Sequence, residues 1–451
     1  MSASLQARPT APAPSDVLGL WRAAAVELSA IARYYDRAIE WRVAENDGAR
    51  LLEGVDCAAK LSITRLDQLP NVRSEEKKRT LIVVDAIEDD RVAIMSVLAE
   101  LRPLVNRSAR LALIGPAAAA CAGEPPGWQI VRARPIGFMG RAVRAAGPLM
   151  DKLVRAPTLL HRAKRGETPH TVRAARRAPR AVTVLRPVLP EPAGSRPSLS
   201  IIIPARNERG NITHALARLP DFGGAGVEVI FVEGHSTDGT WEEIERVVSQ
   251  YRGDCKRAKG LRVRALRQTG HGKADAVRVG FAAATCDLLA VLDADLTMPP
   301  EALAEFYRAY CDGRGDFING DRLSLPMEPG AMRPLNKVGN RFFAWALSHV
   351  LETPLADCLC GTKLFARHDW QRFEAWRADF GYRDPFGDFD LLFPAAALAL
   401  GCVNVPVRYA ARTYGRTNIR RFRDGARLLA MTLEGWWRLH VYRGAANRRD
   451  V

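Results

Sequence analysis

Residues 288–295 read Leu-Leu-Ala-Val-Leu-Asp-Ala-Asp, an apolar run that ends in two carboxylates separated by one residue. The apolar part has the length and composition of a buried strand. Because side chains alternate along an extended chain, we expect Asp293 and Asp295 on the same side of the strand end. Two carboxylates this close repel each other unless a cation lies beside them. A divalent ion, Mg²⁺ or Mn²⁺, bridged to a nucleotide diphosphate would supply that charge, since such ions take one or two protein carboxylates plus phosphate oxygens.

This run is the fourth in a series of strands that alternate with helices. The strands are predicted at 199–203, 227–232, 261–266 and 288–292, and the helices at 211–219, 241–251, 273–284 and 301–311. The alternation predicts an α/β fold with a doubly wound, mostly parallel sheet. Ligands of such sheets bind at the carboxyl ends of the strands. The residues that directly follow the strands are therefore the candidates for a functional site.

Polar segments do follow these strands. They are Pro204-Ala-Arg-Asn-Glu208, Glu233-Gly-His-Ser-Thr-Asp-Gly-Thr240 and, before a helix, Gly270-His-Gly-Lys273. Carboxylates in such places can accept hydrogen bonds from a nucleobase or a ribose. Glycine-rich backbone at a helix start, with Lys273, suits a diphosphate, although it has neither the phosphate-loop nor the dinucleotide spacing. The simpler interpretation of 236–240 is a helix cap, which leaves Glu208 and Glu233 to face a ligand.

With these motifs in order, residues 199–425 resemble a family 2 inverting glycosyltransferase of the GT-A fold, and are similar to polyprenol- and dolichol-phosphate sugar transferases. The resemblance implies a nucleotide-diphosphate sugar donor. It implies a nucleotide pocket lined by Pro204, Asn207, Glu208 and Glu233, with Asp293 at the ribose or metal and Asp295 as a metal ligand. One departure is Gly234, which stands where the family usually has a second acid. It leaves open whether the base is that of UDP or of GDP.

Downstream segments correspond to those that face the acceptor in relatives. Asp388 is the predicted base or acceptor-positioning carboxylate, so that Asp388 and Asp293 are the predicted catalytic residues; the alternative for Asp388 is to cap a helix at 390–398. The cations predicted to bind the acceptor are Arg322, Lys363, Arg412 and Arg416. Arginine forks match phosphate oxygens, and the alternative for Arg412 and Arg416 is a solvated basic loop. The favoured acceptor is a polyprenyl phosphate, and the runner-up is a saccharide or a lipid-linked glycan.

The remaining segments differ in composition. Residues 1–14 are predicted to be a disordered tail, and 15–140 a smaller Rossmann-like α/β domain. That domain is similar to the later half of a class I methyltransferase, but it lacks the glycine-rich motif for S-adenosylmethionine, so we expect a degenerate, non-catalytic module. Residues 141–198 are predicted to be a basic linker or amphipathic segment, because 141–187 carries twelve Lys or Arg against two acids. The transferase domain is predicted at 199–418 and an amphipathic C-terminal helix at 419–451.

Two predicted helices have apolar stripes, and arginines accompany the second. One includes Leu335, Val338 and Phe342, and the other includes Leu429 and Leu433 beside several arginines. Such stripes are typical of interfacial helices, and packing against the catalytic domain is the alternative.

The chain has 451 residues, a formal net charge of +16 and 47% hydrophobic residues, which excludes wholesale disorder. The excess of positive charge favours polyanionic partners. We expect an anionic membrane surface rather than nucleic acid, because no nucleic-acid module is recognisable and aromatic residues are 7%.

Neither a signal peptide nor a membrane-spanning run is recognisable, and the eight cysteines have no zinc spacing. The sequence therefore predicts a cytoplasmic enzyme, peripheral on the inner face of the cell membrane. Rival hypotheses are a non-catalytic nucleotide-sugar binding protein and a nucleic-acid binding protein.

Overall fold

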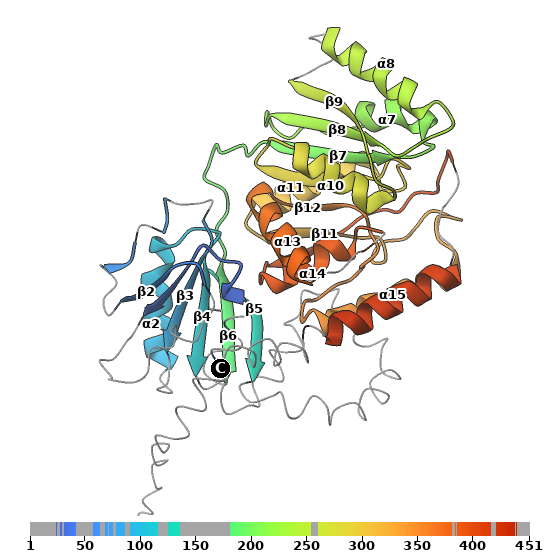
Figure 1. The fold of residues 1–451 in the computed structure, drawn as a ribbon. Helices are drawn as coiled ribbons and strands as arrows, with labels where there is room; N and C mark the ends of the chain where they lie inside the picture. Colours follow the sequence, from blue (N-terminus) through green and yellow to red (C-terminus); the bar gives the residue numbers. More distant parts are fainter. Residues whose placement is uncertain are drawn as a thin grey trace, which may run out of the picture.

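The computed structural model contains two β-sheets, each with helices against it (Figure 1). It describes residues 24, 28, 31–41, 57–63, 68–70, 72–74, 78–85, 91–115, 125–135, 181–253, 260–380, 384, 386–415, 421–437 and 439. The predicted tail at 1–14 and most of the predicted basic linker lie outside the described residues, as do the first and last residues of the predicted C-terminal helix.

The larger sheet is built from the second half of the chain, and its strand order is β13-β11-β12-β10-β7-β8-β9. The strands are β7 (Leu199–Ala205), β8 (Val227–Glu233), β9 (Leu261–Arg267), β10 (Leu288–Val291), β11 (Phe317–Asp321), β12 (Lys363–Ala366) and β13 (Cys402–Pro406). All pairs are parallel except those of β12, which is antiparallel to β10 and β11. The predicted doubly wound, mostly parallel sheet is confirmed.

Helices cover both faces of this sheet. They are α7 (Ile212–Ala217), α8 (Thr240–Gly253), α10 (Lys273–Ala283), α11 (Leu303–Cys311), α12 (Pro334–Val350), α13 (Arg367–Phe380), α14 (Phe389–Ala397) and α15 (Arg421–Trp436). Alternate residues of β7 face opposite cores. Ile201 and Ile203 pack in the core that includes α7, α8 and α11, whereas Ile202 packs in the core that includes α10 and α13. A central strand buried on both faces accounts for the continuous apolar run.

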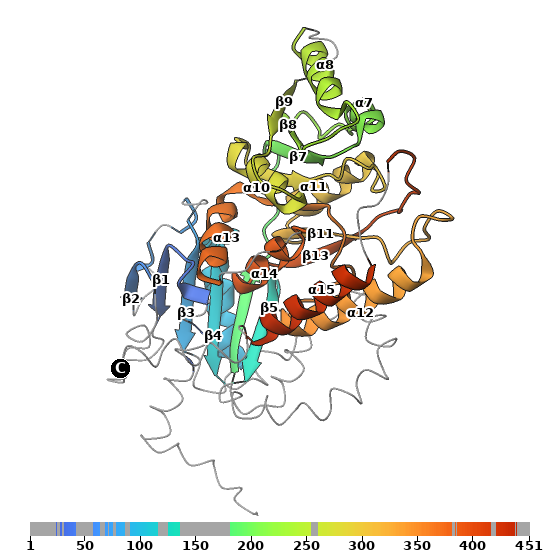
Figure 2. The ribbon, with the colours of Figure 1, turned by 45° about the vertical axis from the view of Figure 1, so that its right-hand side comes forward.

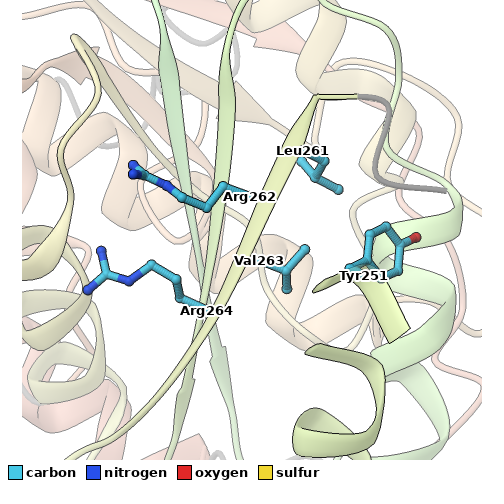
Figure 3. A pocket seen from close by; sticks show the side chains of 5 residues that line it. All are labelled: Tyr251, Leu261, Arg262, Val263 and Arg264. Atoms are coloured by element: carbon cyan, nitrogen blue, oxygen red, sulfur yellow. The ribbon is translucent and has the colours of Figure 1, made fainter. Parts of the chain in front are cut away.

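The edge strand β9 carries charge instead of a second apolar face. Figure 3 shows Arg262 and Arg264 projecting away from Leu261 and Val263. Both guanidinium groups lie 2.9 Å from Oε1 of Glu228 on β8. Charged side chains on an edge strand oppose pairing with another chain, which explains why β9 alternates while β7 and β8 do not.

The smaller sheet has the strand order β2-β1-β3-β4-β6-β5. The strands are β1 (Arg37–Trp41), β2 (Lys60–Ile63), β3 (Thr80–Asp85), β4 (Arg110–Gly115), β5 (Trp128–Pro135) and β6 (Ala181–Pro187), and α2 (Arg91–Leu101) packs against them. The first four strands in the order are parallel, and β6 is antiparallel to both its neighbours. The smaller α/β domain is confirmed, while its similarity to a methyltransferase stays a prediction.

One boundary needs correction. Residues 181–187 were predicted to lie in the basic linker, but they form β6, which is hydrogen-bonded between β4 and β5. Val182 and Val184 face one core while Leu185 faces another, so this short stretch is buried on both sides. Because many arginines surround this stretch in the sequence, composition alone predicts a basic linker and does not indicate the strand formed by its β-branched residues. β6 also leads directly into the larger sheet, where β7 begins at Leu199.

Buried ion pairs join the two sheets. Asp316, which precedes β11, accepts a hydrogen bond from Arg110 and lies 3.5 Å from Arg107 and from Arg186 of the smaller domain. Burial alone would raise the pKa of the Asp316 carboxyl, but these arginines lower it well below its usual range. A second buried pair joins Arg79 to Asp369. Because β11 runs parallel to β10, Asp316 lies at the edge opposite to the carboxyl ends of the central strands. The smaller domain therefore attaches to the larger one away from the predicted site.

Candidate functional site

Asp293 follows β10 and meets the first residue of α10. Lys273 Nζ lies 2.6 Å from Oδ1 of Asp293, and both side chains are half-buried. Burial alone would raise the pKa of Asp293, but the ammonium group outweighs it and the pKa is lowered. In the same way the pKa of Lys273 is raised, because the charges of Asp293 and Asp388 outweigh its burial. Lys273 is therefore a permanent cation at the start of a helix, where a diphosphate would also meet free backbone amides.

Asp295 is bound on both of its oxygens. Oδ1 accepts hydrogen bonds from the backbone and hydroxyl of Thr297, at 3.1 and 2.8 Å. Oδ2 accepts one from Arg412, whose other nitrogen donates to Oε1 of Glu208 at 2.7 Å. Arg412 lies in the loop after β13, and Glu208 follows β7. The guanidinium group of Arg412 thus joins two carboxylates from different strand ends. The third nearby carboxylate, that of Asp293, forms its ion pair with Lys273.

The loops after β7 and β8 are bound to each other. Asn207 Oδ1 accepts a hydrogen bond from the backbone of Thr237 at 2.9 Å, and the backbone of Asn207 donates to Ser236 Oγ at 3.0 Å. Asn207 has a φ of 56°, a conformation that Asn tolerates better than most residues. Glu233 is buried and accepts a hydrogen bond from the backbone of Ser236. Asn207 and Glu233 therefore shape the loops, and Pro204 lies half-buried beside them in β7.

Asp388 lies close to Lys363. Nζ of Lys363, a fully buried residue of β12, is 3.2 Å from Oδ1 of Asp388. The side chain of Asp388 makes no hydrogen bond to the start of α14. Asp384 fills that role, accepting hydrogen bonds from the backbones of Phe389 at 2.7 Å and Phe386 at 2.8 Å. The helix-cap alternative for Asp388 is therefore wrong, and the helix is capped by Asp384, which no sequence pattern singles out.

The three described cations predicted to bind an acceptor each have a carboxylate partner. Lys363 forms an ion pair with Asp388, and Arg412 forms ion pairs with Glu208 and Asp295. Arg322 donates two hydrogen bonds to the buried Asp357, at 2.7 and 3.0 Å. Arg416 lies outside the described residues. Before any of the three could bind a phosphate with its full charge, it would have to exchange its partner.

The protein side chains at this site could hold a divalent metal ion only if a bound ligand also contributes oxygen atoms to the metal. Among the described residues no three His, Cys, Asp or Glu side chains are grouped to hold a metal. Asp293 and Asp295 give one or two carboxylates, which is the number that Mg²⁺ typically takes when phosphate oxygens complete its shell. Oδ2 of Asp295 would be available to an ion only if Arg412 released it. The site therefore fits a metal that arrives together with a diphosphate.

Comparison with known proteins gives the family. Residues 200–372 match the family model of glycosyl transferase family 2, so the chain carries a domain of that family. It is 33% identical over 126 residues to a dolichol-phosphate mannosyltransferase of Pyrococcus furiosus, covering 28% of this chain and 33% of the relative. It is 29% identical over 230 residues to the glycosyltransferase AglJ of Haloferax volcanii, covering 51% of this chain and 68% of the relative.

Among solved structures, the mannosyltransferase PcManGT of Pyrobaculum calidifontis, in complex with GDP-Man and Mn²⁺, is 19% identical with a TM-score of 0.39. The match covers 68% of this chain and 76% of that one.

The buried carboxyl group of Asp384 leads to a prediction of how the stability of the fold depends on pH. Burial raises the pKa of Asp384 to about 7, against roughly 4 in an unfolded chain. The folded state therefore binds a proton more tightly, and this stabilisation is lost as the pH rises toward 7. Asp384→Asn is neutral at every pH. We expect its free energy of unfolding, relative to wild type, to increase from pH 5 to pH 8, by up to roughly 1.4 kcal/mol per pH unit.

Urea unfolding at the two pH values measures this, and the exposed Asp312→Asn is the control. An Asp384→Asn difference that is the same at both pH values would contradict the prediction.

Proposed function

We propose that this chain, with its family 2 glycosyltransferase domain, transfers a sugar with inversion from a nucleotide-diphosphate donor to a polyprenyl phosphate. The observation that carries the proposal is the group of Glu208, Asp293 and Asp295 at the carboxyl ends of β7 and β10, balanced by Lys273 and Arg412. Charges of both signs at one strand edge suit a metal-bound diphosphate. The named similarity to dolichol-phosphate mannosyltransferases supports the acceptor class.

The donor would lie along this edge. Glu208 and Glu233 would face the nucleoside with Pro204 and Asn207, and Lys273 would meet the diphosphate. Asp295 and Asp293 would hold Mg²⁺ or Mn²⁺, which when bound supplies positive charge to the departing diphosphate. Lys273 adds a second positive charge at the start of α10, so that negative charge developing on the leaving group is stabilised by groups already in place.

The acceptor would attack the anomeric carbon from the face opposite to the diphosphate. A phosphate acceptor is already anionic and needs cations such as Arg322, Lys363, Arg412 and Arg416. A hydroxyl acceptor must lose a proton as it attacks, and Asp388, whose charge acts on Lys273, would take this role. The position of Asp388 therefore supports a second candidate, transfer to a hydroxyl of a saccharide or lipid-linked glycan.

The two acceptors predict opposite results for Asp388→Asn. With a lipid phosphate the variant should keep substantial turnover, whereas with a sugar hydroxyl it should lose roughly 10²–10⁴ in rate, the usual contribution of a positioned base. The measurement is steady-state transfer from UDP and GDP sugars to undecaprenyl phosphate and to glycan acceptors. Transfer by the wild type to a glycan hydroxyl alone would contradict the favoured acceptor, and transfer to neither would contradict the proposed function.

Metal binding should depend oppositely on Asp295 and Arg412. Asp295→Asn removes a charged ligand, so we expect the Mn²⁺-dependent part of UDP or GDP binding to disappear while the unfolding midpoint changes little. Arg412→Ala removes a competing cation, so Mn²⁺ alone should bind more tightly, by several-fold or roughly 1 kcal/mol.

Calorimetry of both variants tests this, with Arg408→Ala, an exposed arginine of the same loop, as the control. Unchanged metal dependence in Asp295→Asn would refute the assignment of that ligand.

Peripheral attachment to an anionic membrane at the cytoplasmic face is part of the proposal. None of the described helices is long and apolar enough to cross a bilayer. Helices α12 and α15 pack against each other (Figure 2), and their buried sides contribute Ala344, Leu347, Leu428 and Met431 to the core. Their outward sides expose a set of large apolar side chains: Leu335, Val338, Phe342, Leu429, Leu433, Trp436 and Trp437.

The packing alternative for these stripes is confirmed, because each helix packs with one side. The apolar residues exposed on the other side support the interfacial interpretation, which stays part of the proposal. Arg423 and Arg427, which belong to the same helix α15, are half-exposed. Apolar residues, tryptophan and arginine together suit the interface of an anionic bilayer.

Replacing Val338 and Leu433 by Asp should release the protein from such vesicles. Val338 is 61% exposed and Leu433 58%, so the change should leave the fold intact. In flotation experiments we expect wild type to bind anionic vesicles, to bind less as salt shortens the Debye length, and to bind neutral vesicles weakly. The control is Leu104→Asp, at an exposed position of the smaller domain. Equal flotation of the double variant and the wild type would contradict this surface.

A further inference from the structure

One buried polar atom near the site has no partner. Gln268 follows β9 at the carboxyl edge of the sheet, is 5% exposed, and its Oε1 forms no hydrogen bond within the part of the chain that the structure describes. The backbone of Gln268 donates to the carbonyl of Glu233 at 3.0 Å, which holds the residue against the end of β8. A buried acceptor without a partner is costly and uncommon in folded proteins. Its presence at a ligand-binding edge points to a ligand that supplies the missing donor.

The surroundings place this amide beside Gly234. A Cβ atom at Gly234 would lie 3.4 Å from Nε2 of Gln268, 3.6 Å from the carbonyl oxygen of Ala205 and 3.6 Å from Cβ of Arg206. The carboxamide of Gln268 therefore lies over a residue without a side chain, where the ends of β7, β8 and β9 meet. In the family that the sequence resembles, a second acid usually occupies this position. Here the space beside Glu233 receives a neutral amide from β9 instead.

We propose that Gln268 reads the nucleobase of the donor and selects uracil over guanine. The inference rests on the proposed function, which supplies a nucleotide-diphosphate sugar. Whichever way its plane is turned, a carboxamide offers one acceptor beside one donor. The pairing edge of uracil has a carbonyl acceptor beside the N3–H donor, so both groups of Gln268 are satisfied. Guanine has two adjacent donors, N1–H and the N2 amino group, which suit a carboxylate; an amide that pairs with O6 and N1–H leaves the amino group without a partner.

The neighbouring carboxylate of Glu233 cannot take over the selection of the nucleobase. One oxygen of Glu233 already accepts a hydrogen bond from the backbone of Ser236. A second carboxylate at 234 would have offered two acceptors to guanine, and Gly234 removes that possibility. The base preference is therefore concentrated on the single amide at 268.

Nucleotide binding by three variants tests the inference. Calorimetry with UDP and with GDP, each with Mn²⁺, should show that wild type prefers UDP. Gln268→Glu replaces the donor–acceptor pair by two acceptors, so UDP affinity should fall about tenfold to a hundredfold and the ratio should move toward GDP. Gln268→Leu removes both groups, so UDP affinity should fall without any gain for GDP. Gln371→Glu makes the same chemical change at an exposed position of α13 and should leave both affinities unchanged.

The Leu variant also keeps the experiment interpretable if Gln268→Glu unfolds. Because it replaces an unpartnered buried acceptor by an apolar group, it should be as stable as wild type or more stable in urea. Preference of the wild type for GDP, or a UDP-to-GDP ratio that neither variant alters, would overturn this inference and leave the proposed function standing. Failure of the wild type to bind either nucleotide would overturn both.

Discussion

The balance of charge at the carboxyl ends of β7 and β10 is the constraint on which the rest of the site depends. Asp293 and Asp295 follow β10 and Glu208 follows β7, and the three carboxylates would repel one another without nearby cations. Lys273 neutralises the first, and Arg412 bridges the other two. In this structure each of the three carboxylates has a cationic partner. If a metal-bound diphosphate binds as proposed, Arg412 would have to release Asp295, so donor binding would be linked to a movement of Arg412.

The smaller domain constrains the larger domain from the other side. Its arginines surround Asp316 and Asp369 at the edge opposite to the site, and a buried ion pair is costly to break because the remaining charge is left without a partner. The beginning of β11 and the start of α13 are thus held in place by residues more than a hundred positions away in the chain.

Local patterns were sufficient to predict much of this molecule. The strands β7, β8 and β10 are mostly apolar runs, and the polar residues that follow them predict the ligand edge from local sequence alone. Contacts between distant segments could not be predicted in the same way. The pairing of Arg412 with Glu208 spans 204 positions, and nothing in the basic segment around Arg412 distinguishes a guanidinium that binds carboxylates from one that faces an acceptor. Similarly, β6 is a short β-branched stretch whose neighbours in sequence are arginines, and only its position between β4 and β5 identifies it as a strand.

A crystal of the protein grown with UDP and Mn²⁺ would test the central claim most directly, through the anomalous scattering of the metal. The charge balance described above predicts one Mn²⁺ peak at coordinating distance from Asp295, with diphosphate oxygens completing its shell, Lys273 near the phosphates, and Arg412 no longer bound to Asp295. A nucleotide bound away from the ends of β7 and β10, or a metal peak remote from Asp295 with the Arg412 contact intact, would contradict the claim.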